Sequence, residues 1–313
     1  MFCGMMAQQK SDVAVVGHFS IDTIKLPSRT APFVVMGGSV AYASLTTKLL
    51  GGTASVFSKV GGDFPEAYMQ RLQQEGVDVS GVVKVADAQT TRFELEYTAD
   101  LASRTLRLKN KAPAITLDDL PSSLQAKAVH VAPIAGEIPY EVVEHLRGRG
   151  EVLALDPQGI LRSFDDAGNV TFRSKAEKRL LALVDIYKSS SEEIQATTGL
   201  SDLNAAVKAV HDFGVKIVLV TMGAKGAVLS AEGALHKIPA CICQKYVDPT
   251  GAGDVFIGAF LTEYNRQKDA VWCACVGSAA ASSVVESVGP TVLGEKDDIY
   301  QRARIIYEKE IKQ

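Results

Sequence analysis

Short apolar runs that alternate with helical patterns constrain the fold of this chain more than any other feature. Runs typical of strands lie at 12–17, 53–60, 128–132, 152–156, 184–188 and 217–221. Segments with helical spacing lie between or after them, at 38–50, 63–74, 139–148, 202–212, 253–265, 270–285 and 296–310. Strands separated by helices of this length form parallel βαβ units. The sequence therefore predicts an α/β fold with one doubly wound, mainly parallel central sheet flanked by helices, and Asp63 is expected to cap the helix at 63–74.

A single domain is expected over residues 12–313, because no domain-sized linker interrupts this alternation. Residues 1–11 have neither a basic leader nor an apolar stretch long enough for a signal peptide, so we expect a disordered N-terminal extension there. The formal net charge of -3 supplies no basic field, which argues against a nucleic acid or a membrane surface as partner. The expected partners are small molecules.

The five cysteines are odd in number, which fits a reducing cytoplasm better than a disulfide framework. Cys241 with Cys243, and Cys273 with Cys275, form two C-x-C pairs that could suggest a metal site. Structural zinc sites usually space their cysteines by roughly two to four residues, and no histidine flanks these pairs. We therefore interpret the four residues as small buried hydrophobic side chains of a cytoplasmic protein.

The segment 91–109, TRFELEYTADLASRTLRLK, breaks the α/β rhythm. Apolar and polar residues nearly alternate in it, which predicts a half-exposed hairpin. Together with residues 24–35, this hairpin can form a small antiparallel sheet that projects from the main layer and covers a cleft, with lid segments at about 23–35 and 90–110. A surface hairpin without that role is the alternative.

The stretch DPTGAGDVFIGAF, residues 248–260, places two glycines ahead of a carboxylate and an apolar helix. Glycines let another molecule approach the backbone, and the first turn of a helix offers unpaired N–H groups that attract an anion. Asp254 is therefore either an ordinary helix cap or a base held beside a phosphate. A turn that only needed a cap would require a single glycine, which favours the second interpretation.

Several motifs occur together in a recognisable order. They are Asp22 in GHFSID, the double glycine Gly37–Gly38, SKVGGD at 58–63, TMGAKG at 221–226 and DPTGAGD at 248–254. In order and spacing they resemble the PfkB, or ribokinase-like, family of carbohydrate kinases, and the resemblance covers nearly the whole chain. It implies a ribokinase-like fold with a small β lid and an ATP-dependent, Mg²⁺-dependent transfer of a phosphoryl group to an alcohol.

The resemblance also implies roles for the residues of these motifs. The anion hole for the transferred group is assigned to Gly251, Ala252 and Gly253, and the catalytic base to Asp254. Asp22 is expected to bind two acceptor hydroxyls, beside Gly37, Gly38 and Ser39. His18 either lines this acceptor pocket or is a hydrogen-bonded core histidine.

The donor side is assigned by the same resemblance. Thr221, Gly223 and Gly226 match the turn that binds the nucleotide, and Lys188 and Ser190 lie in the segment KSSSEE, which resembles the family's Asn-x-x-Glu. Glu193 is the carboxylate expected to arrange Mg²⁺ through water, although Ser190 replaces the usual Asn. Asp248 and Thr250 match positions that hold a monovalent cation such as K⁺ in some members.

The acceptor is the least constrained part of the prediction. The segments VAPIAGEI at 131–138 and ALDPQGILR at 154–162, with Gln158 and Arg162, look most like the myo-inositol kinase branch. A cyclic polyol is favoured over a phosphorylated sugar, because no cluster of Arg or Lys is apparent for a second phosphate. Ribose, fructose or nucleoside kinases remain alternatives, and a nucleoside is favoured if Phe93 or Tyr97 stacks over the acceptor.

Other nucleotide-binding folds lack support in the sequence. No Walker-type G-x-x-x-x-G-K-[ST] occurs, and no G-x-G-x-x-G follows the first expected strand, so NTPase and oxidoreductase readings are set aside. A non-catalytic sensor of a sugar or nucleoside remains as an alternative of a different class, although such a sensor need not keep Asp254 and Glu193. The resemblance further implies that the lids of two subunits pair, which predicts a homodimer through residues near 91–109.

Overall fold

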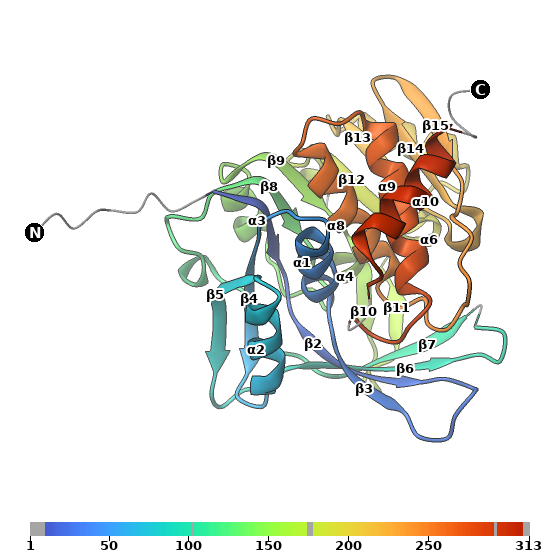
Figure 1. Cartoon of the computed structure of the whole chain (residues 1–313). Coiled ribbons are helices and arrows are strands. Elements are labelled where there is room, and N and C mark those ends of the chain that lie inside the picture. Colours follow the sequence, from blue (N-terminus) through green and yellow to red (C-terminus); the bar gives the residue numbers. More distant parts are fainter. Residues whose placement is uncertain (1–9, 102, 174–177, 291–292, 309–313) are drawn as a thin grey trace, which may run out of the picture.

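The computed structural model describes residues 10–101, 103–173, 178–290 and 293–308 (Figure 1). The main sheet of this part has nine strands in the order β15-β14-β13-β12-β9-β8-β1-β4-β5. Their bounds are β1 Ser11–Val16, β4 Ala54–Gly61, β5 Asp78–Val85, β8 Ala126–Val131, β9 Gly150–Leu155, β12 Ile186–Ser190, β13 Ile217–Thr221, β14 Ala227–Ala231 and β15 Ala234–Ile238. Every pair is parallel except β13–β14 and β14–β15.

Helices cover both faces of this sheet, as predicted. One face carries α1 Ser39–Leu49, α2 Glu66–Gln74, α8 Ala252–Tyr264, α9 Ala270–Val284 and α10 Lys296–Ile306. The other carries α3 Tyr140–Leu146, α5 Lys178–Leu181, α6 Ser191–Thr198 and α7 Leu203–His211. Strand β1 shows why two layers are needed: Val13 and Val15 pack in one core while Ala14 and Val16 pack in the other.

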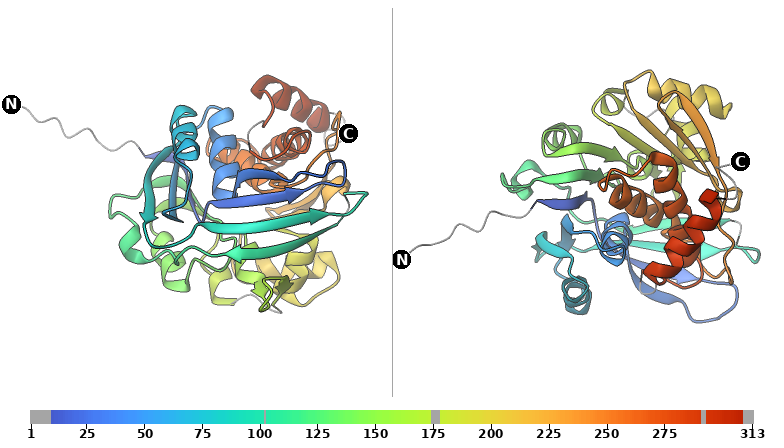
Figure 2. Two further views of the ribbon diagram at one scale, coloured as in Figure 1. Left: turned by 90° about the horizontal axis from the view of Figure 1, so that it is seen from below. Right: turned by 45° about the horizontal axis from the view of Figure 1, so that its top comes forward.

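The two predicted lid segments form a second, four-stranded sheet in the order β3-β2-β6-β7. Its strands are β2 Ser20–Lys25, β3 Phe33–Gly37, β6 Thr91–Tyr97 and β7 Arg104–Asn110. The outer pairs are antiparallel as expected, but the central pair β2–β6 is parallel, because the two segments enter the sheet from the same end. Figure 1 places this small sheet beyond the end of the main layer towards which β4 and β5 point, and Figure 2 shows its strands side by side.

A short hairpin connects the small sheet to the main layer. It consists of β10 Arg162–Phe164 and β11 Val170–Phe172, which directly follow the short helix α4 Gln158–Leu161. The backbone N–H of Leu108 in β7 donates to the carbonyl oxygen of Gly168 at 2.8 Å. A side chain on Gly168 would overlap with the Leu108 carbonyl group, so this contact requires glycine.

Two expectations about local structure are wrong. Asp63 does not cap the second helix, which begins at Glu66 after Pro65; its carboxylate instead accepts from Thr90 N at 2.7 Å and from Arg92 Nη2 at 2.7 Å. These partners are distant in sequence, so the local pattern could not reveal them. The expected extension 1–11 ends too late, since Ser11 already belongs to β1, and residues 1–9 lie outside the described residues.

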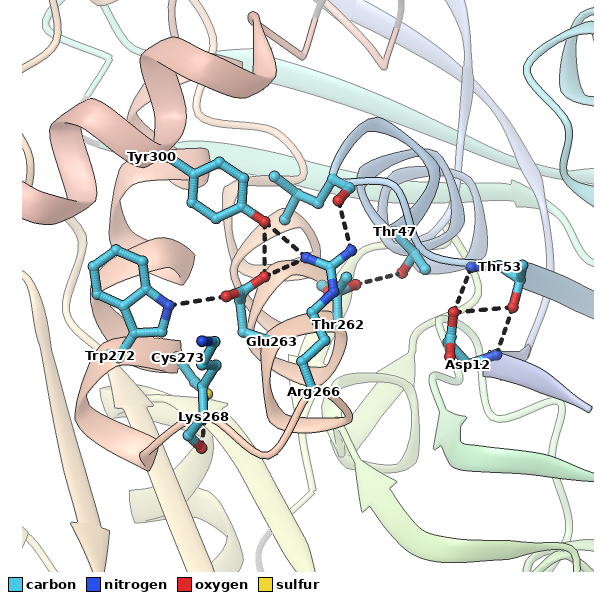
Figure 3. A network of polar contacts seen from close by, with 12 residues as sticks. Asp12, Thr47, Thr53, Thr262, Glu263, Arg266, Lys268, Trp272, Cys273 and Tyr300 are labelled. Carbon is cyan, nitrogen blue, oxygen red and sulfur yellow. Dashed lines mark hydrogen bonds and ion pairs between the residues drawn. The ribbon is translucent and has the colours of Figure 1, made fainter.

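A buried carboxylate joins the ends of several helices (Figure 3). Glu263 accepts from Trp272 Nε1 at 2.8 Å, from Tyr300 Oη at 2.7 Å and from Arg266 Nη1 at 2.6 Å. Arg266 Nη2 also donates to the carbonyl oxygen of Leu50 at 2.8 Å, so the network connects α8, α9 and α10 with the end of α1. Charged and neutral donors thus satisfy both oxygens of this buried carboxyl group.

No helix among the described residues has both the length and the apolar character needed to cross a bilayer. Cys273 and Cys275 are fully buried in the core, as expected for small hydrophobic side chains, whereas Cys241 and Cys243 are only partly buried. The described part of the chain contains no cluster of three or more His, Cys, Asp or Glu side chains that could bind a metal ion.

Candidate active site

A pocket lies between the carboxyl ends of the parallel strands and the small sheet, where open α/β sheets usually bind ligands. The predicted residues that line it are Asp22, Gly38, Ser39, Thr250, Gly251 and Asp254. Four further residues also line it. Tyr42 and Arg104 had no predicted role, and Gln158 and Arg162 were quoted only as features of the myo-inositol kinase branch. The fold therefore brings together the predicted acceptor residues and the predicted base.

Asp22 lies on β2, and Gly37 on the neighbouring strand β3 leaves room for its carboxylate. A side chain on Gly37 would overlap with that carboxylate, so the glycine is needed for packing beside Asp22 rather than for lining the pocket. Within the described part of the structure, Oδ1 of Asp22 is buried without a hydrogen-bond partner. Burial raises the pKa of Asp22 to about 6, although the Ser20 hydroxyl group, Arg104 and Arg162 oppose this rise.

The backbone between β3 and α1 turns sharply at Gly38. Its φ of 91° is in the left-handed region, and a side chain there would overlap with the carbonyl oxygen of His18. His18 is fully buried: its Nε2 donates to Pro113 O at 3.0 Å, and its Nδ1 lies 2.9 Å from Thr91 Oγ1. Of the two readings of His18, the structure supports the hydrogen-bonded core residue.

Asp254 lies in the first turn of α8, after Gly251 in the left-handed conformation with a φ of 80°. The helix has no side-chain cap, so Asp254 is not the ordinary cap that its position allowed. Its Oδ1 accepts from Gln158 Nε2 at 3.2 Å. Burial raises the pKa of Asp254, and the nearby Lys188 ammonium acts in the opposite direction. A buried carboxylate with an increased proton affinity is suited to accept a proton.

The turn before α8 is tightly packed. A side chain on Gly251 would overlap with the ring of Tyr42, and a Cβ on Gly253 would lie 2.6 Å from Lys188 Nζ. The N–H of Ala252 donates to the carbonyl oxygen of Pro249 at 3.2 Å, so it already has a partner within the turn. Of the three residues of the predicted anion hole, Gly251 lines the first pocket, and Ala252 and Gly253 line a second pocket on the donor side.

Lys188 on β12 forms a buried ion pair that sequence reasoning missed. Its Nζ lies 2.6 Å from Oδ2 of Asp156, which directly follows β9, and the two side chains are 6% and 0% exposed. Although burial acts in the opposite direction, Asp156, Asp254 and Glu193 raise the pKa of Lys188. The ammonium group is thus held in its charged form beside Gly253, at the start of α8.

Ser190 and Glu193 form a capping box at the start of α6. The N–H of Ser190 donates to Glu193 Oε2 at 2.7 Å, and the N–H of Glu193 donates to Ser190 Oγ at 3.2 Å. Ser190, which replaces the Asn of the motif that it resembles, therefore caps α6. Burial and the charge of Asp156 raise the pKa of Glu193.

A second pocket of about 450 Å³ lies on the other side of the turn at 248–254. The predicted donor residues Thr221, Gly223 and Gly226 line it, together with mainly apolar side chains that include Ile242, Phe256 and Val285. Residues of the turn alternate between the two pockets: Thr250, Gly251 and Asp254 line the first, whereas Pro249, Ala252 and Gly253 line the second.

Asp248 and Thr250 belong to a network that reaches the small sheet. Oδ1 of Asp248 accepts from the hydroxyl group of Thr250 at 2.6 Å, while Oδ2 is buried without a partner among the described residues. Thr250 Oγ1 lies 2.8 Å from Tyr97 Oη, and Arg104 Nη1 donates to Tyr97 Oη at 2.7 Å. The Tyr97 hydroxyl group is therefore already engaged with protein groups.

The expectation that no arginine cluster lies at the acceptor is wrong. Arg104 from β7 and Arg162 from the start of β10 both line the first pocket, where only the fold could bring them together. Arg162 donates to Ile134 O and to Gln158 Oε1, each at 2.8 Å. Both guanidinium groups thus donate to neighbouring protein atoms.

Comparisons with known proteins agree over most of the chain. A family model described as pfkB family carbohydrate kinase matches residues 10–296. The cytidine kinase of Thermococcus kodakarensis is 28% identical over 289 residues, or 89% of this chain and 97% of that protein. The nucleoside kinase of Methanothermobacter thermautotrophicus is 28% identical over 291 residues, or 89% and 90%. A solved pyrophosphate-dependent kinase in the ribokinase family, complexed with a pyrophosphate analog and myo-inositol, has a TM-score of 0.79 at 25% identity, and the match covers 92% of this chain and 99% of that one.

Proposed function

Because the chain belongs to the PfkB family of carbohydrate kinases, we propose that it transfers the γ-phosphoryl group of ATP to a hydroxyl group of myo-inositol. Family membership makes it a phosphotransferase with an alcohol group as acceptor. The observation that carries the proposal is the position of Asp254 in the first turn of α8, where residues of one turn line both a polar pocket and a largely apolar one. A base at this point suits the transfer of a phosphoryl group from a donor in the apolar pocket to a hydroxyl group of an acceptor in the polar pocket.

The proposed reaction assigns one task to each charged group. Asp22, whose buried Oδ1 has no partner among the described residues, accepts hydrogens from hydroxyl groups of the acceptor. Asp254 accepts the proton of the reacting hydroxyl group. The N–H groups of Gly251 and Gly253 and the ammonium group of Lys188 stabilise the charge on the moving phosphoryl group.

The residues present fit a Mg²⁺ ion carried by the phosphates of ATP. Glu193 is the proposed carboxylate that orders the water ligands of this ion. The charges of Asp156 and Lys188 both act on it, so it lies near the groups that are proposed to surround the phosphates. When bound, Mg²⁺ neutralises charge on the phosphate oxygens. We further propose that Asp248 can hold a monovalent cation, because its buried Oδ2 has no partner among the described residues.

The donor pocket supports a nucleotide over a smaller donor. The structural neighbour with myo-inositol is named as pyrophosphate-dependent, so pyrophosphate is a second donor to test. The pocket of about 450 Å³ beside Gly253 is lined mainly by apolar residues, as expected for a base and a ribose. Thr221, Gly223 and Gly226 are the proposed contacts to the nucleotide, with Lys188 and Ser190 near its phosphates.

The choice of myo-inositol rests on the polar first pocket and on the neighbour complexed with myo-inositol. A nucleoside is the second candidate, because two relatives are named as a cytidine kinase and a nucleoside kinase and because Phe93 lines the pocket. Against it, the Arg162 guanidinium group lies 5.6 Å from the centre of the Phe93 ring, in the space a stacked base would need.

Two further proposals concern the surroundings of the enzyme. A homodimer through the small sheet is supported by the edge strand β3, whose Val34 is 59% exposed. A reducing cytoplasm is the proposed location, on the grounds of the cysteine content.

The first experiment measures ADP release from Mg²⁺-ATP with myo-inositol, ribose, fructose, fructose 6-phosphate, adenosine and cytidine, and phosphate release from pyrophosphate in parallel. We expect turnover on myo-inositol with ATP. Asp254→Asn should reduce that turnover by about a hundredfold or more, while ligand binding persists. Asp87→Asn, an exposed carboxylate outside both pockets, is the matched control. Turnover only on another acceptor would replace the inositol assignment, and binding without any turnover would favour a sensor.

A further inference from the structure

We propose that Gln158 is a positioning residue that fixes the carboxylate of Asp254, and that Arg162 fixes the orientation of the Gln158 amide. This inference rests on the proposed function, in which Asp254 is the base. Neither Gln158 nor Arg162 belongs to the motifs that carry the chemistry.

The amide of Gln158 is surrounded by three polar side chains. Gln158 opens the short helix α4, directly beyond the strand end that carries Asp156. Its Nε2 donates to Ser39 Oγ at 2.7 Å and to Asp254 Oδ1 at 3.2 Å. Its Oε1 accepts from Arg162 Nη2 at 2.8 Å.

Chemistry permits only this orientation of the amide. A guanidinium group has donors and no acceptor, whereas an ionised carboxylate has acceptors and no donor. The reversed amide would direct Oε1 at the Asp254 carboxylate and Nε2 at the guanidinium group of Arg162, and both contacts would be repulsive. Arg162 is itself held by Ile134, whose carbonyl oxygen accepts from its Nη1 at 2.8 Å. The fixed guanidinium group therefore determines which face of Gln158 meets the base.

The consequence for Asp254 is both geometric and electrostatic. The hydrogen bond to Oδ1 restricts rotation of the carboxylate, which Ser39 also contacts through a side-chain hydrogen bond. A donor to the charged form also opposes the rise in the pKa of Asp254 that burial causes. Gln158 thus aligns the base and donates to its charged form without adding charge to the pocket.

Several charged or titratable groups from different elements face Asp254 and must be held constant in the test. They are Lys188 on β12, Asp156 after β9, Arg162 on β10 and Tyr42 on α1. Replacing Gln158 by an apolar residue changes none of these charges. Replacing Arg162 by methionine removes one positive charge, so Arg162→Lys, which keeps both the charge and a donor, is the conservative variant.

The test compares Gln158→Leu, Arg162→Met, Arg162→Lys and the double variant Gln158→Leu/Arg162→Met with the wild type, and uses the exposed Gln74→Leu as the matched control. Folding of each is checked by urea denaturation. We expect Gln158→Leu to reduce kcat about tenfold to a hundredfold, with a small change in the acceptor KM. The acidic limb of the kcat profile should move up by about one pH unit, because the ionised carboxylate loses a donor. Arg162→Lys should recover most of the activity lost in Arg162→Met, and the double variant should resemble Gln158→Leu.

A second readout does not depend on catalysis. Titration of ¹³C-labelled Asp side chains by NMR, with the Asp254 signal assigned from Asp254→Asn, should show the same upward shift in Gln158→Leu. An unchanged Asp254 titration would overturn the inference even if the wild type proved to be a kinase. A wild type that is inactive on every acceptor, but shows the shift, would remove the proposed function and leave the contact between Gln158 and Asp254. A higher acceptor KM with kcat unchanged would instead make the two residues substrate contacts.

Discussion

Replacement of Asp22 by asparagine should change the stability of the protein in a pH-dependent way. Compared with the wild type, the variant should gain unfolding free energy as the pH rises from acidic to neutral. Asp22 is 5% exposed, and burial raises its pKa from the ordinary value of 3.8 to about 6. At about 1.4 kcal/mol per unit, the folded state bears a cost of about 3 kcal/mol when the carboxyl group is ionised. A raised pKa means that the folded state binds the proton more tightly than the unfolded state. The stability that the protonated Asp22 contributes is therefore fully present below about pH 4 and is lost as the pH rises through about 6.

Urea denaturation of Asp22→Asn and wild type at several pH values tests this calculation. Subtracting the two unfolding free energies removes the titration of every other group. The difference should shift in favour of the variant by about 2 kcal/mol between about pH 4.5 and pH 8, since part of the 3 kcal/mol already applies at the lower pH. The constant effect of the asparagine amide, whatever its sign, cancels in this comparison. The same variant should raise the acceptor KM at least about tenfold, because asparagine lacks the charge that binds hydroxyl hydrogens.

The matched control is again Asp87→Asn, whose carboxylate is exposed. Its stability difference should stay constant over the same pH range. A constant difference for Asp22→Asn as well would mean that the Asp22 carboxyl group titrates normally in the folded protein, and the argument from burial would then be refuted. Unchanged acceptor KM would remove Asp22 from the acceptor site.

Two other substitutions test the packing around the base. Gly251→Ala should reduce kcat at least about tenfold, because residue 251 has a φ of 80° and the added Cβ would overlap with the ring of Tyr42. Gly199→Ala is the control, since Gly199 has a φ of 76° but no atom within 4 Å of the added Cβ. In urea denaturation this control should show only the backbone strain of about 1 kcal/mol. Lys188→Met should decrease the unfolding free energy by about 3–5 kcal/mol, because it leaves Asp156 buried and unpaired. The double variant Lys188→Met/Asp156→Asn should recover part of that loss. Equal stability of the single and the double variant would contradict the ion-pair argument.

The arrangement of elements could be predicted because the signals are local and strong. Buried parallel strands such as β13 are continuous apolar runs, and the helices between them have lengths that permit few other topologies. The strands β5 and β15 were missed because they are edge strands of mixed polarity, and β14 was missed because it is a short, buried strand of only five residues. Asp63 shows the limit of a local rule, since Thr90 and Arg92 compete for its carboxylate from a distant segment.

The candidate site was predictable to the extent that its residues lie in motifs. Asp22 and Asp254 both line the first pocket. Each lies near a glycine, Gly37 or Gly251, at which a side chain would overlap with neighbouring atoms. Asp156 ends an ordinary strand, and Arg104 lies in a strand whose polar residues were expected to face solvent. Their importance comes from contacts with Lys188 and Tyr97, and no pattern of sequence spacing encodes those contacts.

The division of one turn between two pockets has an evolutionary consequence. Thr250, Gly251 and Asp254 serve the first pocket while their neighbours serve the second, and the remaining walls come from separate stretches of the chain. Strands β2, β6 and β7 can therefore diverge without touching the donor side, and the segment after β13 can diverge without touching the acceptor side. A lineage built on this plan can inherit one chemical step and acquire new substrates by substitutions confined to one half of the gene, which is consistent with relatives named as cytidine kinase, fructokinase and ribokinase.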